Sequence, residues 1–421
     1  MATTSFSRLG SASTYDSALR NISARQSALS SLQENLTSGK RVVRASDDPT
    51  SAGIAERALT RIGRIATDQR ALESQRNAIT QAESVLGDVT DALQRFRELT
   101  VSAGNGTHSS ADRLTMAAEM RGLREQIYAL ANREDSNGLP LFSALGSALK
   151  PFVGPQATPP DYTFNGLPGQ SASTNVAIPF ALDGDSAFML TPKRDAAYNV
   201  SLNSGNSSLQ ASAVSISDVT LVTGSSYSLS NIGITAVIPA TSPATSVATY
   251  DLVETPAGTT IPLAAVSTTG PAFPSGSKTI PLTVPGLAIS VTGTPTLGDT
   301  ITIKTNASLF SVLDNAISDI GGASNNNTAL QAVNQALHNI DIGMQRVTSV
   351  RGQAGELLNR ADRISNNQEK RSIQMEADRS RAEDLDMVKG ISEFQNQQTG
   401  YQAALQTYAQ VQKLSLFNFI G

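Results

Sequence analysis

Apolar residues recur at helical spacing near both ends of the chain, separated alternately by four and three positions. The stripe near the start consists of Ala18, Ile22, Leu29, Leu32 and Leu36, and Arg25 interrupts it. The stripe near the end consists of Met387, Ile391, Phe394, Tyr401, Leu405 and Tyr408, and Gln398 interrupts it. Because so narrow a stripe does not stabilise an isolated helix, each terminal helix needs a partner helix. The two ends therefore indicate a chain made for assembly.

A longer helix is predicted between these ends, in the first half of the chain. Its apolar positions repeat every seven residues at Ile65, Leu72, Ile79, Leu86 and Leu93, with Ala82, Val89, Phe96 and Ala103 in a second set. A strict seven-residue repeat favours a left-handed supercoiled bundle. Asp47-Asp48-Pro49 marks the start of the helix, with an Asp cap and Pro in the first turn, and Gly104-Asn105-Gly106 marks its end.

Two further helices complete a predicted rod. One spans about 110–132, with apolar residues at Leu114, Ala117, Met120, Leu123 and Ile127, and with Arg121 and Arg124 outside the stripe. The other lies in the last third, with apolar residues at Leu330, Val333, Leu337, Ile340, Met344, Val347, Ala354, Leu358 and Ala361, and Arg351 breaks the rhythm. Thr328 followed by Gln331 fits a capping box. The rod is thus expected to contain two helices from the first half and one from the last.

The middle of the chain has a different pattern. Sixteen of the 18 prolines lie between Pro151 and Pro295. Short alternating runs contain Val214, Ile216, Val219, Ile232, Ile234, Val237, Ile301 and Ile303. Such runs, punctuated by proline and glycine, predict an antiparallel β sandwich or small barrel. The predicted class is α+β: long N- and C-terminal helices form a coiled-coil-like rod, and one all-β domain is inserted.

These patterns divide the chain into five segments. They are an N-terminal axial helix (1–44), the first half of the rod (45–140), a β-rich outer domain (141–307), the second half of the rod (308–383) and a C-terminal axial helix (384–421).

Composition argues against catalysis and against several kinds of partner. The formal net charge is −4, which favours neither nucleic acid nor anionic membrane as a partner. Cysteine is absent, and the two histidines, His108 and His338, lie far apart in the sequence. We therefore predict no enzyme, no catalytic residue, no cofactor and no metal. No run of 18 apolar residues and no secretory signal is present. The charged run 376–386 is expected to be a solvated helix face or a rim of ion pairs between subunits.

Three motifs resemble the flagellin superfamily. Ser38–Pro49 (SGKRVVRASDDP) is similar to its N-terminal signature, and the Asp-Asp-Pro form is more typical of the hook–filament junction members than of filament flagellin. Residues 130–138 (LANREDSNG) and 408–417 (YAQVQKLSLF) are also similar to segments of the junction members. The resemblance covers roughly the first 140 and last 110 residues, and the middle domain carries none of it.

The resemblance implies a structural component of the extracellular bacterial flagellum, exported by the flagellar type III apparatus without a cleaved signal. The expected function is an adaptor ring that joins the hook to the filament. The implied partners are the first hook-associated protein, flagellin, copies of the chain itself, and an export chaperone at the C-terminal helix. The terminal stripes would be the assembly interface, folding on binding. A filament-forming flagellin is the alternative.

Overall fold

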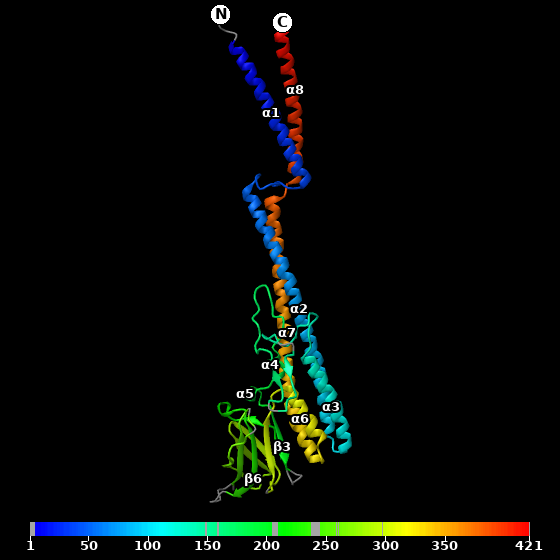
Figure 1. The fold of residues 1–421 in the computed structure, drawn as a ribbon, viewed down its shortest axis with the longest axis vertical. Coiled ribbons are helices and arrows are strands. Elements are labelled where there is room, and N and C mark those ends of the chain that lie inside the picture. Colours follow the sequence, from blue (N-terminus) through cyan, green and yellow to red (C-terminus); the bar gives the residue numbers. More distant parts are fainter. Residues whose placement is uncertain are drawn as a thin grey trace. The chain divides into compact units, whose positions relative to one another are not determined.

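The computed structural model describes residues 5–147, 150–157, 160–203, 209–236, 245–257, 259, 261–296 and 298–420, and side chains between 15 and 410 (Figure 1). The chain divides into two compact units: Met1–Arg70 with Ser365–Gly421, and Ala71–Ile364. The first unit is therefore made from both ends of the chain, and the second from the middle.

Helices form the first unit. It contains α1 (Ser5–Ser38) and α8 (Met387–Ile420), which lie side by side in Figure 1, together with the beginning of α2 (Pro49–Ala103) and the end of α7 (Asn326–Glu383). The predicted start and end of the long helix, at Pro49 and before Gly104, are confirmed. The two terminal helices are present at both ends, as the stripes predicted.

In the second unit, α2 and α7 run antiparallel and are joined by α3 (Ser110–Ala131) and α6 (Leu309–Gly321). Three ion pairs give their register: Arg97 with Asp341 at 2.9 Å, Arg351 with Glu83 at 2.7 Å, and Arg76 with Asp362 at 3.4 Å. The seven-residue repeat faces the core as predicted. Fully buried positions on α2 are Ile79, Ala82, Leu86, Val89, Leu93, Phe96 and Ala103.

Several details of the helical prediction are wrong. The last third supplies two helices, not one, because α6 precedes α7 and packs on α3. Asn325, not Thr328, caps α7: its side chain accepts the Thr328 N–H at 2.9 Å. Gln331 is buried and accepts the N–H of Ala211 at 2.9 Å, so it plays no part in a capping box.

The predicted stripe of α3 also needs correction at two positions. Leu114 is exposed, although it was expected to be apolar core. Arg124, expected outside the stripe, is buried because its guanidinium pairs with Asp314 of α6 at 2.8 Å and lies over the ring of Tyr162. Burial raises the pKa of Asp314, and Arg124 opposes that shift.

The β domain consists of two antiparallel sheets around one apolar core. The six-stranded sheet contains β3 (Tyr198–Asn203), β12 (Thr300–Thr305), β6 (Ser226–Ala236), β7 (Thr245–Thr255) and β8 (Val266–Thr269) in this order, with β9 (Phe273–Pro274) also on β7. The four-stranded sheet contains β10 (Thr279–Val284), β11 (Leu287–Thr292) and β4 (Gln210–Ala211), with β5 (Ser215–Ile216) also on β11. Side chains of both sheets form one shared core, so of the two predicted architectures, sandwich or small barrel, the domain has the sandwich.

Most predicted strand residues lie in strands, namely Ile216, Ile232, Ile234, Ile301 and Ile303. Val214 is buried directly before β5. Val219 is an exception, because it is exposed in a 3₁₀ turn (Val219–Leu221) that Asp218 caps. Val237 lies outside the described residues.

Residues 141–197 differ from the rest of the range expected for the inserted domain. This segment contains the hairpin of β1 (Phe152–Val153) and β2 (Thr163–Phe164) and the short helices α4 (Gly184–Phe188) and α5 (Pro192–Asp195). Its buried aromatic rings join the helical core, where Phe152 and Phe188 contact Phe310 of α6. The β core itself begins at Tyr198. The predicted α+β class, with long terminal helices and an inserted all-β domain, is confirmed.

A row of buried amides on α7 attaches the β domain to the helices. Gln331, Gln335 and Asn339 follow one another at intervals of four and are each at most 6% exposed. Gln335 Nε2 donates to the carbonyl of Ser212 at 2.9 Å, and Asn339 Nδ2 donates to the carbonyl of Tyr198 at 2.9 Å. These bonds satisfy backbone groups at sheet edges that would otherwise be buried without partners.

Candidate assembly interface

The motif Ser38–Pro49 forms the turn between α1 and α2. Gly39 has φ +70°, a conformation that favours glycine, and α1 ends just before it. Asp48 caps α2: its carboxylate accepts the Ser51 N–H at 3.1 Å and the Ser51 hydroxyl at 2.6 Å. These bonds lower the pKa of Asp48 to about 2. The predicted helix cap is therefore confirmed, with Asp48 as the capping residue.

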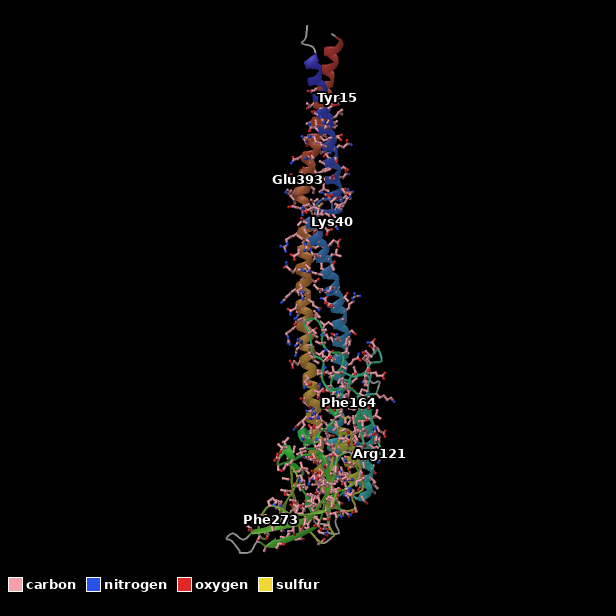
Figure 2. All side chains as sticks on the ribbon, turned by 60° about the vertical axis from the view of Figure 1, so that its left-hand side comes forward. Tyr15, Lys40, Arg121, Phe164, Phe273 and Glu393 are labelled. Carbon is pink, nitrogen blue, oxygen red and sulfur yellow. The ribbon has the colours of Figure 1, made fainter. Side chains whose placement is uncertain are left out.

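The same turn binds the break between α7 and α8. The Arg41 N–H donates to the carbonyl of Glu383 at 2.7 Å, and the Leu385 N–H donates to the carbonyl of Gly39 at 2.9 Å. The Lys40 ammonium, labelled in Figure 2, pairs with the carboxylate of Glu383. We call these contacts between 39–41 and 382–385 the clasp. It joins the two ends of the chain by backbone bonds.

Arg41 holds the clasp to the start of α2. Its guanidinium donates to the carbonyl of Ala382 at 2.9 Å, to the Ser51 hydroxyl at 3.1 Å and to the Asp48 carboxylate at 3.3 Å. One side chain thus links three helix ends. Sequence reasoning identified the motif but not its contact with 382–385, since nothing in the local pattern indicates a partner more than 300 residues away.

The charged run 376–386 makes its described ion pairs within the chain. Arg379 pairs with Glu376 at 2.6 Å, and Arg381 pairs with Asp378 at 2.5 Å, each three residues apart on α7. Glu383 belongs to the clasp. These contacts fit the prediction of a solvated helix face, the first of the two alternatives for this run; the second was a rim of ion pairs between subunits.

The predicted stripe of α1 is its least exposed face. Its five members Ala18, Ile22, Leu29, Leu32 and Leu36 are half-buried, whereas most of their neighbours are exposed. Packing between α1 and α8 covers this face. The ring of Tyr15 lies 5.6 Å from that of Tyr408, measured between centroids.

The predicted stripe of α8 splits into two faces. Phe394, Tyr401 and Tyr408 are half-buried. Met387, Ile391 and Leu405 are 45%, 46% and 40% exposed. Val388, which sequence reasoning passed over, is 82% exposed. The chain therefore leaves an apolar strip on α8 (Met387, Val388, Ile391 and Leu405) that its own described residues do not cover.

Two glycines that sequence reasoning missed bring α1 and α8 together. A β-carbon on Gly390 would lie 3.2 Å from Leu36 Cδ2, and one on Gly400 would lie 2.6 Å from an Arg25 guanidinium nitrogen. Arg25 can interrupt the apolar stripe of α1 because it lies against Gly400 of α8, which has no side chain. Buried Gly390 and half-buried Phe394, Gln397, Tyr401, Ala404 and Tyr408 have the three-four spacing, with Gln397 in the place expected for Gln398.

A small cavity lies between α2 and α7 in the first unit. It has a volume of about 220 Å³ and is lined by Ile54, Arg57, Ala58, Arg61, Met375 and Asp378. Ile54 in this lining is 40% exposed. An apolar side chain exposed beside a hollow is typical of protein–protein contact surfaces.

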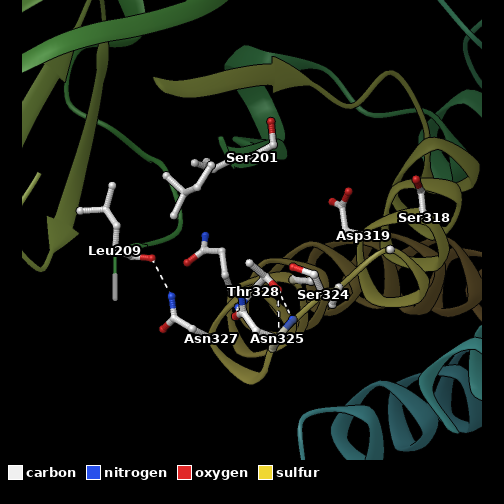
Figure 3. Close-up of a pocket in the computed structure, with 14 residues that line it drawn as sticks. Ser201, Leu209, Ser318, Asp319, Ser324, Asn325, Asn327 and Thr328 are labelled. Carbon is white, nitrogen blue, oxygen red and sulfur yellow. Dashed lines mark hydrogen bonds between the residues drawn. The ribbon is translucent and has the colours of Figure 1, made fainter. Parts of the chain in front are cut away.

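A cavity of about 370 Å³ lies in the second unit, where β3 meets the end of α6 and the beginning of α7 (Figure 3). Hydroxyl and amide groups line it, and Asn327 Nδ2 donates to the carbonyl of Leu209 at 3.0 Å across its wall. Burial raises the pKa of Asp319, its one carboxylate, which accepts a bond from Asn199 at 3.1 Å. Among the described hydrogen bonds, none joins a hydroxyl of this lining to the Asp319 carboxylate, as an activated nucleophile would require.

The described residues show no constellation for metal chemistry and no span for a membrane. They contain no group of three or more His, Asp or Glu side chains placed to hold a metal ion. No helix within the described ranges is long and apolar enough to cross a bilayer.

Two family models match the helical ends. The bacterial flagellin N-terminal helical region matches residues 11–146, and the bacterial flagellin C-terminal helical region matches residues 337–420, together just over half of the chain. The chain belongs to the flagellin family. As in the sequence motifs, the match omits the β domain.

Relatives within the flagellin family include junction and filament proteins. The chain is 35% identical to flagellar hook-associated protein 3 of Salmonella typhimurium over 153 residues, which are 34% of this chain and 46% of the relative. It is 36% identical to the Escherichia coli protein of the same name over 146 residues, 33% and 44% of the two chains. The flagellar filament 41 kDa core protein of Borreliella burgdorferi is 34% identical over 126 residues, 30% and 38%. The matched segments thus span less than half the length of each relative.

Solved structures of flagellin-family proteins have a similar fold. The flagellar junction protein FlgL of Legionella pneumophila superposes with a TM-score of 0.53 at 24% identity, covering 73% of this chain and 98% of that one. A hook-associated protein-3 structure from the same organism gives 0.56 at 24% identity, covering 76% and 97%. At this identity the likeness supports the fold.

Proposed function

We propose that the chain is a structural junction protein of the bacterial flagellum, an adaptor ring between hook and filament. The uncovered apolar strip on α8, beside an α1 that covers only the other face of that helix, carries the proposal. A surface of this kind on a terminal helix is suited to packing against neighbouring subunits. The similarity to proteins named hook-associated protein 3 favours the junction over other flagellar positions.

Assembly would proceed by folding on binding. The terminal residues Ala18, Ile22, Leu29, Leu32 and Leu36 of α1 and Met387, Ile391, Phe394, Tyr401, Leu405 and Tyr408 of α8 form the interface in this proposal. A two-helix element buries little apolar area by itself, so contact with further subunits offsets the entropy of ordering. The segments 1–44 and 384–421 would be axial, 45–140 and 308–383 the rod, and 141–307 the outer domain.

The proposed partners are the first hook-associated protein on one side, flagellin on the other and copies of the chain around the ring. The proposed location is extracellular, after export through the flagellar type III apparatus, with a chaperone on the C-terminal helix before assembly. The role is mechanical, with no catalytic step.

A filament-forming flagellin is the second candidate, because filament proteins of the family are nearly as similar to the chain. A junction protein stops after one short layer, whereas a flagellin continues to polymerise into a long filament. Purified chain incubated with isolated hooks that carry the first hook-associated protein is expected to add one short layer and then to accept flagellin. A chain that grows long filaments without a seed would contradict the junction and favour flagellin. A chain that adds to neither end would contradict both.

A further inference from the structure

The six-stranded sheet of the β domain ends in a strand that is bonded on one side. β8 pairs with β7, with Thr269 opposite Thr249 and Val266 opposite Leu252. The N–H of Gly270 donates to the carbonyl of Ala248 at 2.8 Å in continuation of the pairing. Because backbone groups alternate in direction along an antiparallel strand, those of Ser267 and Thr269 point away from β7. Phe273 of β9, labelled in Figure 2, pairs with β7 beyond the end of β8 and leaves this edge open.

Side chains bond backbone groups on the other end strands of the two large sheets. Asn339 of α7 bonds the Tyr198 carbonyl of β3, and Gln331 bonds the Ala211 N–H of β4. On β10, the Tyr250 hydroxyl accepts the Thr283 N–H at 3.0 Å and donates to the Thr283 carbonyl at 2.6 Å. Among the described residues, no comparable side chain bonds the outward groups of β8.

The segment that leads into this edge is apolar and exposed. Between 261 and 266 the sequence is IPLAAV, and Ile261, Leu263 and Val266 are 75%, 53% and 61% exposed. No charged residue occurs between Thr255 and Ser277. Natural proteins commonly protect an open edge with charge or a covering element. β8 has neither in the described structure, which is the arrangement that strand addition requires.

We propose that β8 is a docking edge for β8 of a second copy of this chain. An antiparallel pair would join the two six-stranded sheets across a two-fold axis. The uncharged sequence favours self-pairing, since it places no like charges opposite each other and offers none to a charged partner. Among the described end strands, β8 is the one whose outward backbone groups are bonded by no side chain, and pairing it with the same strand of a copy makes the contact isologous.

The size of the surface sets the strength of the contact. Covering the exposed side chains of Ile261, Leu263 and Val266 removes roughly 300 Å² per copy, against about 800 Å² per partner in a stable complex. The contact is therefore a weak, concentration-dependent dimer. It is separate from the terminal helices and independent of the proposed junction function.

Matched lysine substitutions test the edge. Sedimentation velocity of the full chain over rising concentration should show a dimer that Val266→Lys weakens at least tenfold. Val219→Lys should leave it unchanged, because Val219 is similarly exposed (52%) but lies outside the edge. Equal thermal unfolding of both variants would show that folding is intact. Unchanged association in Val266→Lys would overturn the proposal.

Cross-linking separates this contact from association through the terminal helices. The chain has no cysteine, so single substitutions Val266→Cys, Ser267→Cys and Thr268→Cys report their own neighbours. At least one should form a disulfide dimer under mild oxidation much faster than Val219→Cys, since paired strands lie within disulfide distance. Equal rates in all four variants would overturn the proposal. So would a complex of β8 with an extended segment of a different protein in place of the copy.

Discussion

At the scale of single residues, Asp48 shows how the motif of the family acts locally. It caps the start of α2, where its carboxylate accepts the Ser51 hydroxyl. The same carboxylate also accepts a bond from Arg41, which is part of the clasp. Its pKa, lowered to about 2 chiefly by the Ser51 hydroxyl, lies below the ordinary value of 3.8. A carboxyl group whose pKa falls on folding stabilises the fold above its unfolded pKa, and this contribution disappears as pH falls toward the folded pKa.

Replacement of Asp48 by Ala should therefore lower the melting temperature of the first unit at pH 7 and have progressively less effect as pH falls from about 4 to 2. Thermal unfolding by circular dichroism at a series of pH values measures this. Glu56→Gln, at an exposed carboxyl of α2 in the same unit, is the control and should change little. A constant effect of Asp48→Ala from pH 7 to 2 would show that the ionised cap is not responsible.

Arg124 gives a residue-scale prediction for the second unit. Its removal leaves the carboxylate of Asp314, whose side chain is 36% exposed, without its guanidinium partner. Arg124→Met should lower the free energy of unfolding by about 2 kcal/mol, since it removes hydrogen bonds to a charged and partly buried group. Denaturant unfolding at pH 7 measures the loss. Arg121→Met, on the exposed side of the same helix, should cost less than about 0.5 kcal/mol.

At the scale of elements, the sequence was most informative where one period repeats over many turns. On α2 the capping residues and the glycines predicted the bounds, and the heptads predicted the buried face, because local propensity and tertiary burial agree there. α6 lies within the range 308–383 predicted as rod, but the three-four spacing of its apolar residues did not separate it from α7. The buried amides of α7 and the partner of Arg124 depend on distant segments, and no local pattern encodes such contacts. On α8 the predicted stripe combined residues of two faces, the half-buried face and the exposed apolar strip, because both have helical spacing.

The amide row of α7 supports a prediction about this element. Asn339→Leu removes the donor to the Tyr198 carbonyl and leaves that group buried without a partner. The expected loss is about 2 kcal/mol in the free energy of unfolding. His338→Leu, an exposed neighbour on the same helix, should be close to neutral. Denaturant unfolding of both variants tests the difference, and equal losses would rule out a specific role for the amide.

At the scale of the whole molecule, the family match and the β domain occupy different parts of the chain. The family models cover helices, whereas the sandwich lies between them in sequence. The proposed assembly through the helices and the proposed association through β8 should therefore be separable by mutation.

Ile391→Lys tests the assembly surface. Because Ile391 is 46% exposed in the single chain, the charge should leave thermal unfolding nearly unchanged and abolish addition to hook ends. Leu114→Lys, at an exposed position of α3, is the control and should still assemble. Attachment measured by electron microscopy of seeded hooks distinguishes the two. Normal attachment of Ile391→Lys would remove this strip from the proposed interface.

The clasp also constrains the order in which the chain can fold. Arg41 and Ala382 are 341 residues apart in sequence, yet their contact joins one turn to one helix break. In the proposed export through a narrow channel, one end of the chain emerges before the other. Whichever end emerges first, its residues of the clasp have no partner until the rest of the chain has followed, so the first unit should be completed after the second has had time to form. We therefore expect that a chain without residues 39–41 or 382–385 does not complete this unit, and that only a chain with both segments presents it.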